Sequence, residues 1–270
     1  MLDHLDLFSG IGGFSLGLER TGGFKTVAFC EIDPFCQKVL KKHWPEVKQY
    51  HDITNAKFTE NVGLVTAGFP CQDISYAGEG AGITGERSGL FWYIIRTLCM
   101  VGRPKLLLEN VAGLLNRGLC TVLGALASFG YDAEWHCIPA SAVGAPHIRD
   151  RIWIIANANE FNDVGSGYGA GKRCGEQPPP AGVQRRDNVA DSDSGNKYGR
   201  CRTLQMGGIW SQEKIKIDDI KRGIKWSPEP DVGRVAYGVS DRVDKLRGLG
   251  NAVVPQIPEI IGYAILEAEK

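Results

Sequence analysis

The sequence predicts an α/β fold built on a doubly wound, mainly parallel sheet. Over residues 1–156, short apolar runs alternate with stretches that carry apolar residues at helical spacing, which is the order of parallel strands joined by helices. A glycine-rich turn follows the first apolar run, as is common where a strand leads into a helix in such sheets. With 43% hydrophobic and 23% charged residues, the composition is that of a globular protein.

Each element follows from its local pattern. The helix predicted over residues 34–43 begins with Pro34, which is favoured in a first helical turn. A short strand is expected just before Asp52, and the strands at 134–138 and 151–156 are expected to pair with each other. The predicted strands are residues 5–8, 26–30, 63–67, 105–108, 134–138 and 151–156, and the predicted helices are residues 13–20, 34–43, 89–101, 119–129 and 258–268.

The amino-acid composition of the chain changes at Asn157. From there to Asp231 the sequence is rich in Gly, Asn, Asp, Arg and Lys, contains the run Pro178-Pro179-Pro180, and lacks hydrophobic periodicity. This pattern is typical of a loop-rich segment. We therefore predict a core made of residues 1–156 and 248–270, and a small loop-rich subdomain at residues 157–247.

Charge and cysteine usage limit the class of protein. Lys plus Arg and Asp plus Glu each number 31, so no net charge attracts a polyanion to the whole surface. No apolar run reaches the 18 residues of a membrane span, and the N-terminus lacks the pattern of a signal peptide. The eight cysteines form no Cys-x-x-Cys pair, so no metal site is expected. We expect a cytoplasmic protein that does not bind membranes.

The turn at Gly10-Ile11-Gly12-Gly13 is the first candidate site. Glycines there let the backbone approach a ligand closely, and Glu31, at the end of the second strand, is placed to accept both hydroxyls of an adenosine ribose. These residues suit a dinucleotide and S-adenosylmethionine about equally, although Ser15 replaces the third glycine of the dinucleotide pattern. A tight turn without a ligand is the alternative. Asp52 is placed to bond an adenine amino group or, as a solvated turn residue, to cap a helix.

The sharpest feature is Gly68-Phe69-Pro70-Cys71-Gln72, which directly follows the strand at 63–67. Proline fixes the chain at the carboxyl end of that strand, where ligands bind in open α/β sheets. The segment at residues 75–89 carries five glycines and Arg87, a composition that suits a lid over a substrate. Most cysteines are structural, but this position favours a reactive thiol.

Two charged motifs lie further along the chain. Glu109 is predicted to stand immediately beyond the apolar strand at 105–108, where loss of water raises the pKa of an acid and prepares it for proton transfer. Arg149 and Arg151 are two positions apart, so on an extended chain both side chains point the same way. Alternatively they form a surface pair with Asp150.

In order and kind, these motifs resemble those of the DNA (cytosine-5) methyltransferases of bacteria and phages. Ile32 stands where the family often has an aromatic residue, so Phe8 is expected to be the main group stacking on adenine. His147 stands where the family usually has glutamine. The matching motifs are the turn at residues 8–13, Glu31, Asp52, Pro70-Cys71-Gln72, Glu109-Asn110-Val111, Arg149-x-Arg151 and Gly250-Asn251-x-x-x-Pro255.

The resemblance implies the Rossmann-like fold of S-adenosylmethionine-dependent methyltransferases, with residues 157–247 as the target-recognition subdomain. It implies S-adenosylmethionine as the cofactor, S-adenosylhomocysteine as the product, and no metal. The implied cofactor-binding residues are Phe8, Gly10, Gly12, Gly13, Glu31, Ile32, Asp52, Ile53, Pro70 and Asn251; the catalytic residues are Cys71, Glu109, Arg149 and Arg151; the substrate-binding residues are Gln72, Ser75, Arg87, Asn110, Val111, Arg185 and Arg186.

The reaction implied by the resemblance is methylation of carbon 5 of cytosine within a specific sequence of double-stranded DNA. Cys71 would bond to carbon 6 of a flipped-out cytosine. Glu109 would protonate or hydrogen-bond ring N3, Arg151 would contact O2, and Arg149 would support Cys71 or a nearby phosphate. A monomer is expected. A cognate restriction endonuclease is a possible partner, but the reaction does not require one.

Three other readings stay open at this point. A tRNA cytosine-5 methyltransferase would use the same core and the same Cys71 and Glu109 chemistry. A dinucleotide-dependent oxidoreductase would use the glycine turn and Glu31 but leave Cys71 and Glu109 idle. A catalytically inactive DNA-binding module would need neither of those two residues.

Overall fold

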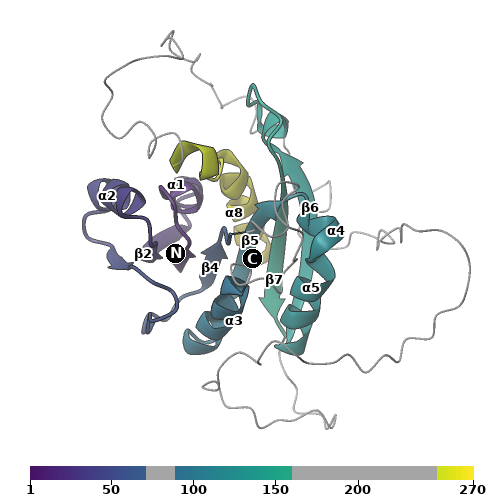
Figure 1. Ribbon diagram of the computed structural model, residues 1–270, viewed down its shortest axis with the longest axis horizontal. Helices are drawn as coiled ribbons and strands as arrows, with labels where there is room; N and C mark the ends of the chain where they lie inside the picture. Colours follow the sequence, from purple (N-terminus) through teal and green to yellow (C-terminus); the bar gives the residue numbers. More distant parts are fainter. Residues whose placement is uncertain (71–88, 160–247) are drawn as a thin grey trace, which may run out of the picture.

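The computed structural model describes residues 1–70, 89–159 and 248–270, which share one seven-stranded sheet with the strand order β3-β2-β1-β4-β5-β7-β6 (Figure 1). Strands β1 to β5 pair in parallel, whereas β7 is antiparallel to both β5 and β6. The mainly parallel α/β sheet and the closing strand pair are thus confirmed.

The helices of the first 50 residues begin and end where the sequence predicts, while the later elements differ by a few residues. The strands are β1 Leu2–Leu7, β2 Phe24–Cys30, β3 Lys48–Tyr50, β4 Leu64–Ala67, β5 Lys105–Val111, β6 Tyr131–Pro139 and β7 Asp150–Ala158. The helices are α1 Gly13–Arg20, α2 Pro34–His43, α3 Leu90–Met100, α4 Leu114–Arg117, α5 Leu119–Ser128 and α8 Gln256–Ala268, with a short 3-10 helix, η2, at Ala140–Val143. Helix α4 was not predicted.

The sheet is covered on both faces, as a doubly wound fold requires (Figure 1). On one face, Phe91 of α3 and Val122 of α5 belong to the same apolar cluster as Leu5 of β1. On the other, Phe14 of α1 and Ile261 of α8 share a second cluster with strand residues from β4, β5 and β7. The alternation of side chains along β1 and β4 divides the core into these two layers.

Helix α1 lies unusually close to the segment that precedes α8. A Cβ atom at Gly13 would lie 2.5 Å from the carbonyl oxygen of Val253, and one at Gly17 would lie 2.1 Å from that of Pro255. Any side chain at these positions would therefore displace backbone. The contact holds residues 248–255 against the first turn of α1, beside the glycine turn.

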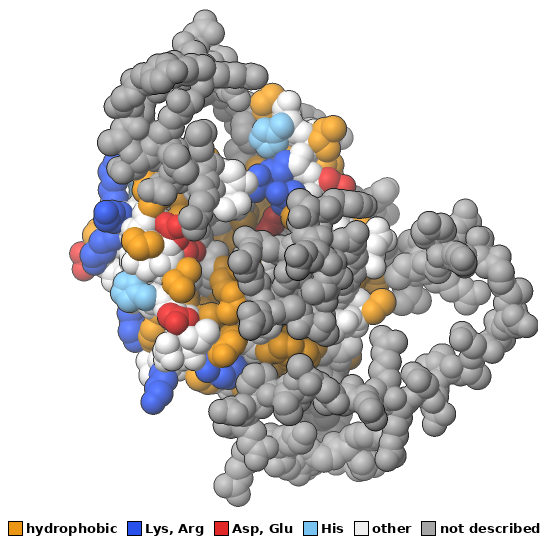
Figure 2. Space-filling model, viewed as in Figure 1, with side chains coloured by type: hydrophobic (Ala, Val, Ile, Leu, Met, Phe, Trp, Pro, Cys, Tyr) orange, Lys and Arg blue, Asp and Glu red, His pale blue; other side chains and the backbone are white. Residues whose placement is uncertain are grey.

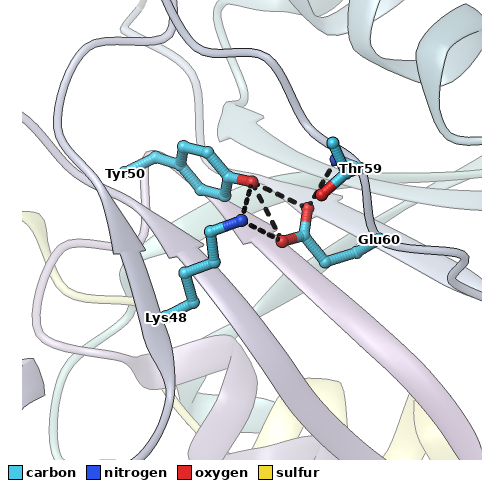
Figure 3. A network of polar contacts seen from close by, with 4 residues as sticks. All are labelled: Lys48, Tyr50, Thr59 and Glu60. Atoms are coloured by element: carbon cyan, nitrogen blue, oxygen red, sulfur yellow. Dashed lines mark hydrogen bonds and ion pairs between the residues drawn. The ribbon is translucent and has the colours of Figure 1, made fainter.

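The loop after β3 is fastened to that edge strand by the polar cluster in Figure 3. Glu60 accepts hydrogen bonds from Lys48 Nζ at 2.9 Å and from the Tyr50 hydroxyl at 2.9 Å, and the ammonium of Lys48 lies 4.5 Å from the centre of the Tyr50 ring. The backbone N–H of Thr59 also donates to Glu60. These bonds fix the ends of the segment that contains Asp52.

Basic side chains gather along the edge of the molecule where α2 lies (Figures 1 and 2). Helix α2 carries Lys41, Lys42 and His43 in its last turn. Cations are favourable there because the carboxyl end of a helix is negative. This basic group is explained by the helix itself, and we assign it no ligand.

By length and composition, one stretch among the described residues, Gly248–Ala268, is apolar enough to cross a membrane. Its helix proper, α8, has 13 residues. Ile257, Ile261 and Ile265 on this helix are buried in the protein at 1% exposure or less. That is the pattern of a core helix.

Candidate active site

The predicted site residues converge at the carboxyl ends of the parallel strands, which meet at one edge of the sheet. Gly10 follows β1, Glu31 follows β2, and Pro70 follows β4, while Glu109 lies near the end of β5. The topology thus brings together residues separated by up to 99 positions in the chain.

The glycine turn leaves room for a ligand at Gly10. This residue has φ +54° and nothing within 4 Å of where a Cβ would lie. At Gly12, with φ +87°, a Cβ would lie 2.7 Å from the ring of Trp44, and Gly13 packs against Val253. Gly12 and Gly13 are therefore needed for packing, whether or not they also contact a cofactor, and Gly10 is the open position.

Glu31 is already tied to this turn. Its carboxylate accepts a hydrogen bond from the backbone N–H of Gly10 at 2.7 Å and another from that of Asp33 at 2.8 Å. Each oxygen keeps a further lone pair for a donor such as a ribose hydroxyl. Beside it, Ile32 is 68% exposed and Phe8 is half-buried with φ +52°, so apolar surface flanks the turn.

Asp52 caps a turn, as part of the alternative prediction had it, but no helix lies in the described residues between it and β4. Its carboxylate accepts from the backbone N–H of Thr54 at 2.9 Å and from the Thr54 hydroxyl at 2.8 Å, and these bonds lower its pKa. Ile53 is 5% exposed, so its side chain offers little surface to a ligand, and its cofactor contact stays a prediction. Arg96 of α3 donates to the carbonyl oxygens of Ile53, Thr54 and Ala56. A bond from Asp52 to adenine stays a prediction.

Glu109 and Arg151 form the charged pair of the site. Arg151 Nε lies 2.9 Å from Glu109 Oε1, and the side chains are 23% and 13% exposed. Burial raises the pKa of Glu109, although the charges of Arg151 and Arg149 act in the opposite direction. A Cβ at Gly68 would lie 3.6 Å from Glu109 Oε2. The carboxyl group therefore faces the segment that leads to Cys71.

Two predictions and one alternative about these residues are wrong in detail. Glu109 does not stand beyond its strand, because β5 continues to Val111 through antiparallel pairing with β7. Arg149 precedes β7 and has φ +36°, so the argument from an extended chain fails for it. Nor does Arg151 pair with the carboxylate of Asp150, whose backbone oxygen accepts its hydrogen bond instead.

Arg149 holds the segment that carries Asn251. Its guanidinium donates to the carbonyl oxygens of Gly250 at 2.7 Å and Ala252 at 2.8 Å. Asn251, between those two residues, is exposed. The observed role of Arg149 is thus to position this segment; support of Cys71 or of a phosphate stays a prediction.

Asn110 is buried and hydrogen-bonded within the protein. It is 3% exposed, its amide donates to the carbonyl oxygen of Phe69 at 3.2 Å, and its own oxygen accepts from the backbone N–H of Val111 at 2.8 Å. The observed role of Asn110 is to fix Phe69, the residue before Pro70; its contact with substrate stays a prediction. Val111 is half-buried, and its substrate contact stays a prediction.

Several predicted residues lie outside the described residues. They are Cys71, Gln72, Ser75, Arg87, Arg185 and Arg186, together with residues 160–247 of the predicted recognition subdomain.

Sequence reasoning missed a buried polar group beneath the glycine turn. His4, Asp6, Ser15 and Thr66 are fully buried and hydrogen-bonded to one another. A signal was present, because His4 and Asp6 alternate with Leu5 and Leu7 in a strand that is buried on both faces. It also missed Arg96, for which no local pattern is informative.

The fold and the site define a chain with the Rossmann-like core of a methyltransferase. The family model for C-5 cytosine-specific DNA methylases matches residues 2–220, and the chain belongs to that family. It is 40% identical to the type II methyltransferase M2.BsuMI of Bacillus subtilis over 84% of this chain, and 37% identical to M.Eco47II of Escherichia coli over 76% of it. The chain spans 60% and 53% of the lengths of these two relatives.

Solved structures show the same fold. A putative DNA modification methyltransferase encoded within an E. coli prophage is 26% identical, with a TM-score of 0.50 over 58% of this chain and 47% of that one. The Dnmt2 methyltransferase of S. pombe is 24% identical, with a TM-score of 0.50 over 59% of this chain and 51% of that one.

Proposed function

We propose that this chain transfers a methyl group from S-adenosylmethionine to carbon 5 of cytosine in double-stranded DNA. The observation that carries the proposal is the partly buried Glu109–Arg151 pair, whose carboxyl group faces Gly68, three residues before Cys71. Family membership and the names of the type II relatives support the same reaction.

The residues at the sheet edge fit the cofactor. When bound, S-adenosylmethionine supplies an electrophilic methyl group on a sulfonium centre. The open position at Gly10 admits a ligand beside the backbone, and Glu31 keeps acceptor capacity for ribose hydroxyls. We assign Ile32 and Phe8 to the adenine, and the Asn251 segment, held by Arg149, to the remaining part of the cofactor.

Cytosine needs activation because its carbon 5 is a poor nucleophile. In the proposed reaction the thiolate of Cys71 bonds to carbon 6, and the electron pair of the C5–C6 double bond moves toward carbon 5. Carbon 5 takes the methyl group and then loses its proton, for which water is the proposed acceptor. Those electrons restore the double bond and expel the thiolate.

Glu109 is suited to assist the first step. Burial favours its protonated form, and a protonated carboxyl can donate to ring N3, where negative charge would otherwise accumulate. Arg151, already bonded to Glu109, is proposed to contact O2 of the base. The partly buried Glu109–Arg151 pair would thus orient the ring and neutralise the charge that develops on it.

The reacting carbon lies inside the DNA stack, so the cytosine must be flipped out. We assign residues 75–89 to closure over the base, and residues 157–247, with Arg185 and Arg186, to phosphate contacts and base readout. Action in the cytoplasm as a monomer, with or without a cognate restriction endonuclease, completes the proposal.

The test is methyl incorporation by the wild type and Cys71→Ala. With labelled cofactor, wild type should methylate duplex DNA, and Cys71→Ala should lose transfer while retaining cofactor affinity. A duplex containing 5-fluorocytosine should trap a covalent adduct with wild type, because fluorine blocks the final elimination. Transfer by Cys71→Ala at the wild-type rate would overturn the mechanism, and incorporation into tRNA alone would favour the RNA enzyme.

A further inference from the structure

The buried polar group beneath the glycine turn has no part in the proposed reaction. His4 and Asp6 of β1, Thr66 of β4 and Ser15 of α1 have no measurable exposure. Buried polar groups cost free energy unless they are hydrogen-bonded. Apolar replacements are often neutral or stabilising, so stability alone does not account for four such residues in one place.

The contacts set the direction of each hydrogen bond. Thr66 donates its hydroxyl proton to Asp6 Oδ1 at 2.9 Å, so its oxygen accepts from His4 Nε2, 2.8 Å away. Because His4 then carries its proton on Nε2, its Nδ1 accepts from the hydroxyl of Thr26 at 3.4 Å. Ser15 donates to Asp6 Oδ2 at 2.9 Å. These hydrogen bonds link β2, β1, β4 and α1.

Asp6 anchors the first turn of α1 through Ser15. The N-cap residue Gly12 offers no side chain, and the first turn holds no acidic residue. Asp6 accepts a hydrogen bond from the hydroxyl of Ser15, which lies in the first turn of α1. A carboxylate at a helix N-terminus is favourable. The bond from Ser15 thus ties the first turn of α1, and with it the glycine turn at residues 10–12, to Asp6.

We propose that Thr66 is a positioning residue for the cofactor: its hydroxyl holds Asp6 in the orientation that fixes the glycine turn, and so couples that turn to the strand leading to Cys71. Thr66 is paired in register with Asp6 and stands four residues before Pro70. This inference rests on the proposed function, because the cofactor concerned is that of the methyl transfer.

The test compares Thr66→Val, which removes the hydroxyl but keeps the shape, with Thr66→Ser, which keeps the hydroxyl. Calorimetric titration of S-adenosylmethionine into the full chain, without DNA, measures affinity. We expect Thr66→Val to weaken binding about tenfold, because Asp6 and His4 each lose a buried partner, and Thr66→Ser to stay within about twofold of wild type.

A matched control is Thr97→Val. Thr97 is as buried as Thr66, but its hydroxyl bonds the carbonyl oxygen of Tyr93 within α3, so its loss should leave cofactor affinity unchanged. Hydrogen exchange of residues 8–15 in the cofactor-free protein gives a second readout: the turn should exchange faster in Thr66→Val than in Thr66→Ser. If Thr66→Val does not fold, Ser15→Ala removes the other hydroxyl on Asp6 and should weaken binding in the same way.

Wild-type affinity in Thr66→Val, or equal weakening in Thr66→Val and Thr66→Ser, would overturn the inference. The proposed function fails by a different result. A wild-type chain that binds the cofactor but methylates no DNA would overturn that function. The cofactor affinities of the Thr66 variants would still show whether Thr66 positions the glycine turn.

Discussion

The cofactor half of the site, on β1 to β3, and the catalytic half, on β4, β5 and β7, are held by different kinds of contact. In the cofactor half, Glu31 and Asp52 accept hydrogen bonds from backbone N–H groups two residues ahead. In the catalytic half, Arg151 reaches Glu109 on another strand, and Arg149 reaches a carbonyl 101 positions away. The carboxylates of the first half are held in part by local turns, although Glu31 also accepts from Gly10, 21 positions away. The charged groups of the second half depend on the topology of the sheet.

This difference predicts that methyl transfer and cofactor binding can be lost separately. The largest loss is expected in the transfer rate when Glu109 is replaced. Glu109→Gln keeps the shape but cannot deliver a proton in the same way, so methyl transfer should slow at least about 100-fold. Cofactor affinity should stay within about twofold, because Glu109 belongs to the other half of the site. Single-turnover transfer with labelled cofactor, beside calorimetric binding, measures both. An unchanged transfer rate would remove Glu109 from the chemistry.

Glu31→Ala should show the opposite behaviour. Loss of hydrogen bonds to a charged group predicts cofactor binding weaker by roughly 10- to 100-fold, with a smaller change in transfer rate once the cofactor is saturating. Glu46→Ala, which removes an exposed glutamate from the same half, is the control. If Glu31→Ala lowered the saturated rate but not the affinity, the division of the site into two halves would be wrong.

Gly13→Ala tests the packing that brings residues 248–255 to the cofactor half. Its Cβ would lie 2.5 Å from a backbone oxygen, so we expect a loss of about 1–3 kcal/mol in unfolding free energy. Gly124→Ala is the matched change, since it lies in α5 with nothing within 4 Å of its Cβ position; it should stabilise by about 0.5–1 kcal/mol. Denaturant unfolding of both variants decides, and equal effects would contradict the packing argument.

The smallest effect concerns pH, because two buried groups oppose each other. Burial raises the pKa of Asp6 from 3.8 to about 7, so its contribution to stability falls as pH rises across that interval. Burial lowers the pKa of His4 from 6.5 to about 3, so its contribution rises with pH up to 6.5. Between pH 4 and 6.5 these two opposite changes in unfolding free energy largely cancel.

Replacing one of the two groups should reveal the pH dependence that the other gives to the unfolding free energy. His4→Phe should leave a protein whose unfolding free energy falls as pH rises from 4 to 7, and Asp6→Asn one whose unfolding free energy rises from pH 4 to 6.5. Denaturant midpoints at several pH values provide the measurement. Parallel profiles in both variants would show that the two groups do not titrate as their burial implies.

Much of the fold was predictable because it depends on local pattern. Helices α1 and α2 begin and end at the predicted residues, since a glycine turn and a proline mark their starts. The end of β5 was not predictable, because β7 extends it through pairing that is remote in sequence. The same pairing sets Arg151 beside Glu109. The inward direction of Asn110 depends on the Phe69 carbonyl, which no local pattern reveals.

The sequence by itself determined which chemical groups are present and the order in which strands and turns deliver them, because hydrophobic period, glycine and proline act over a few residues. Tertiary structure alone decided which groups meet: Glu109 with Arg151, Arg149 with the Asn251 segment, and Thr66 with Asp6 and His4. Those contacts follow from strand order and burial. Both are properties of the whole packed sheet, in which residues far apart in the chain become neighbours.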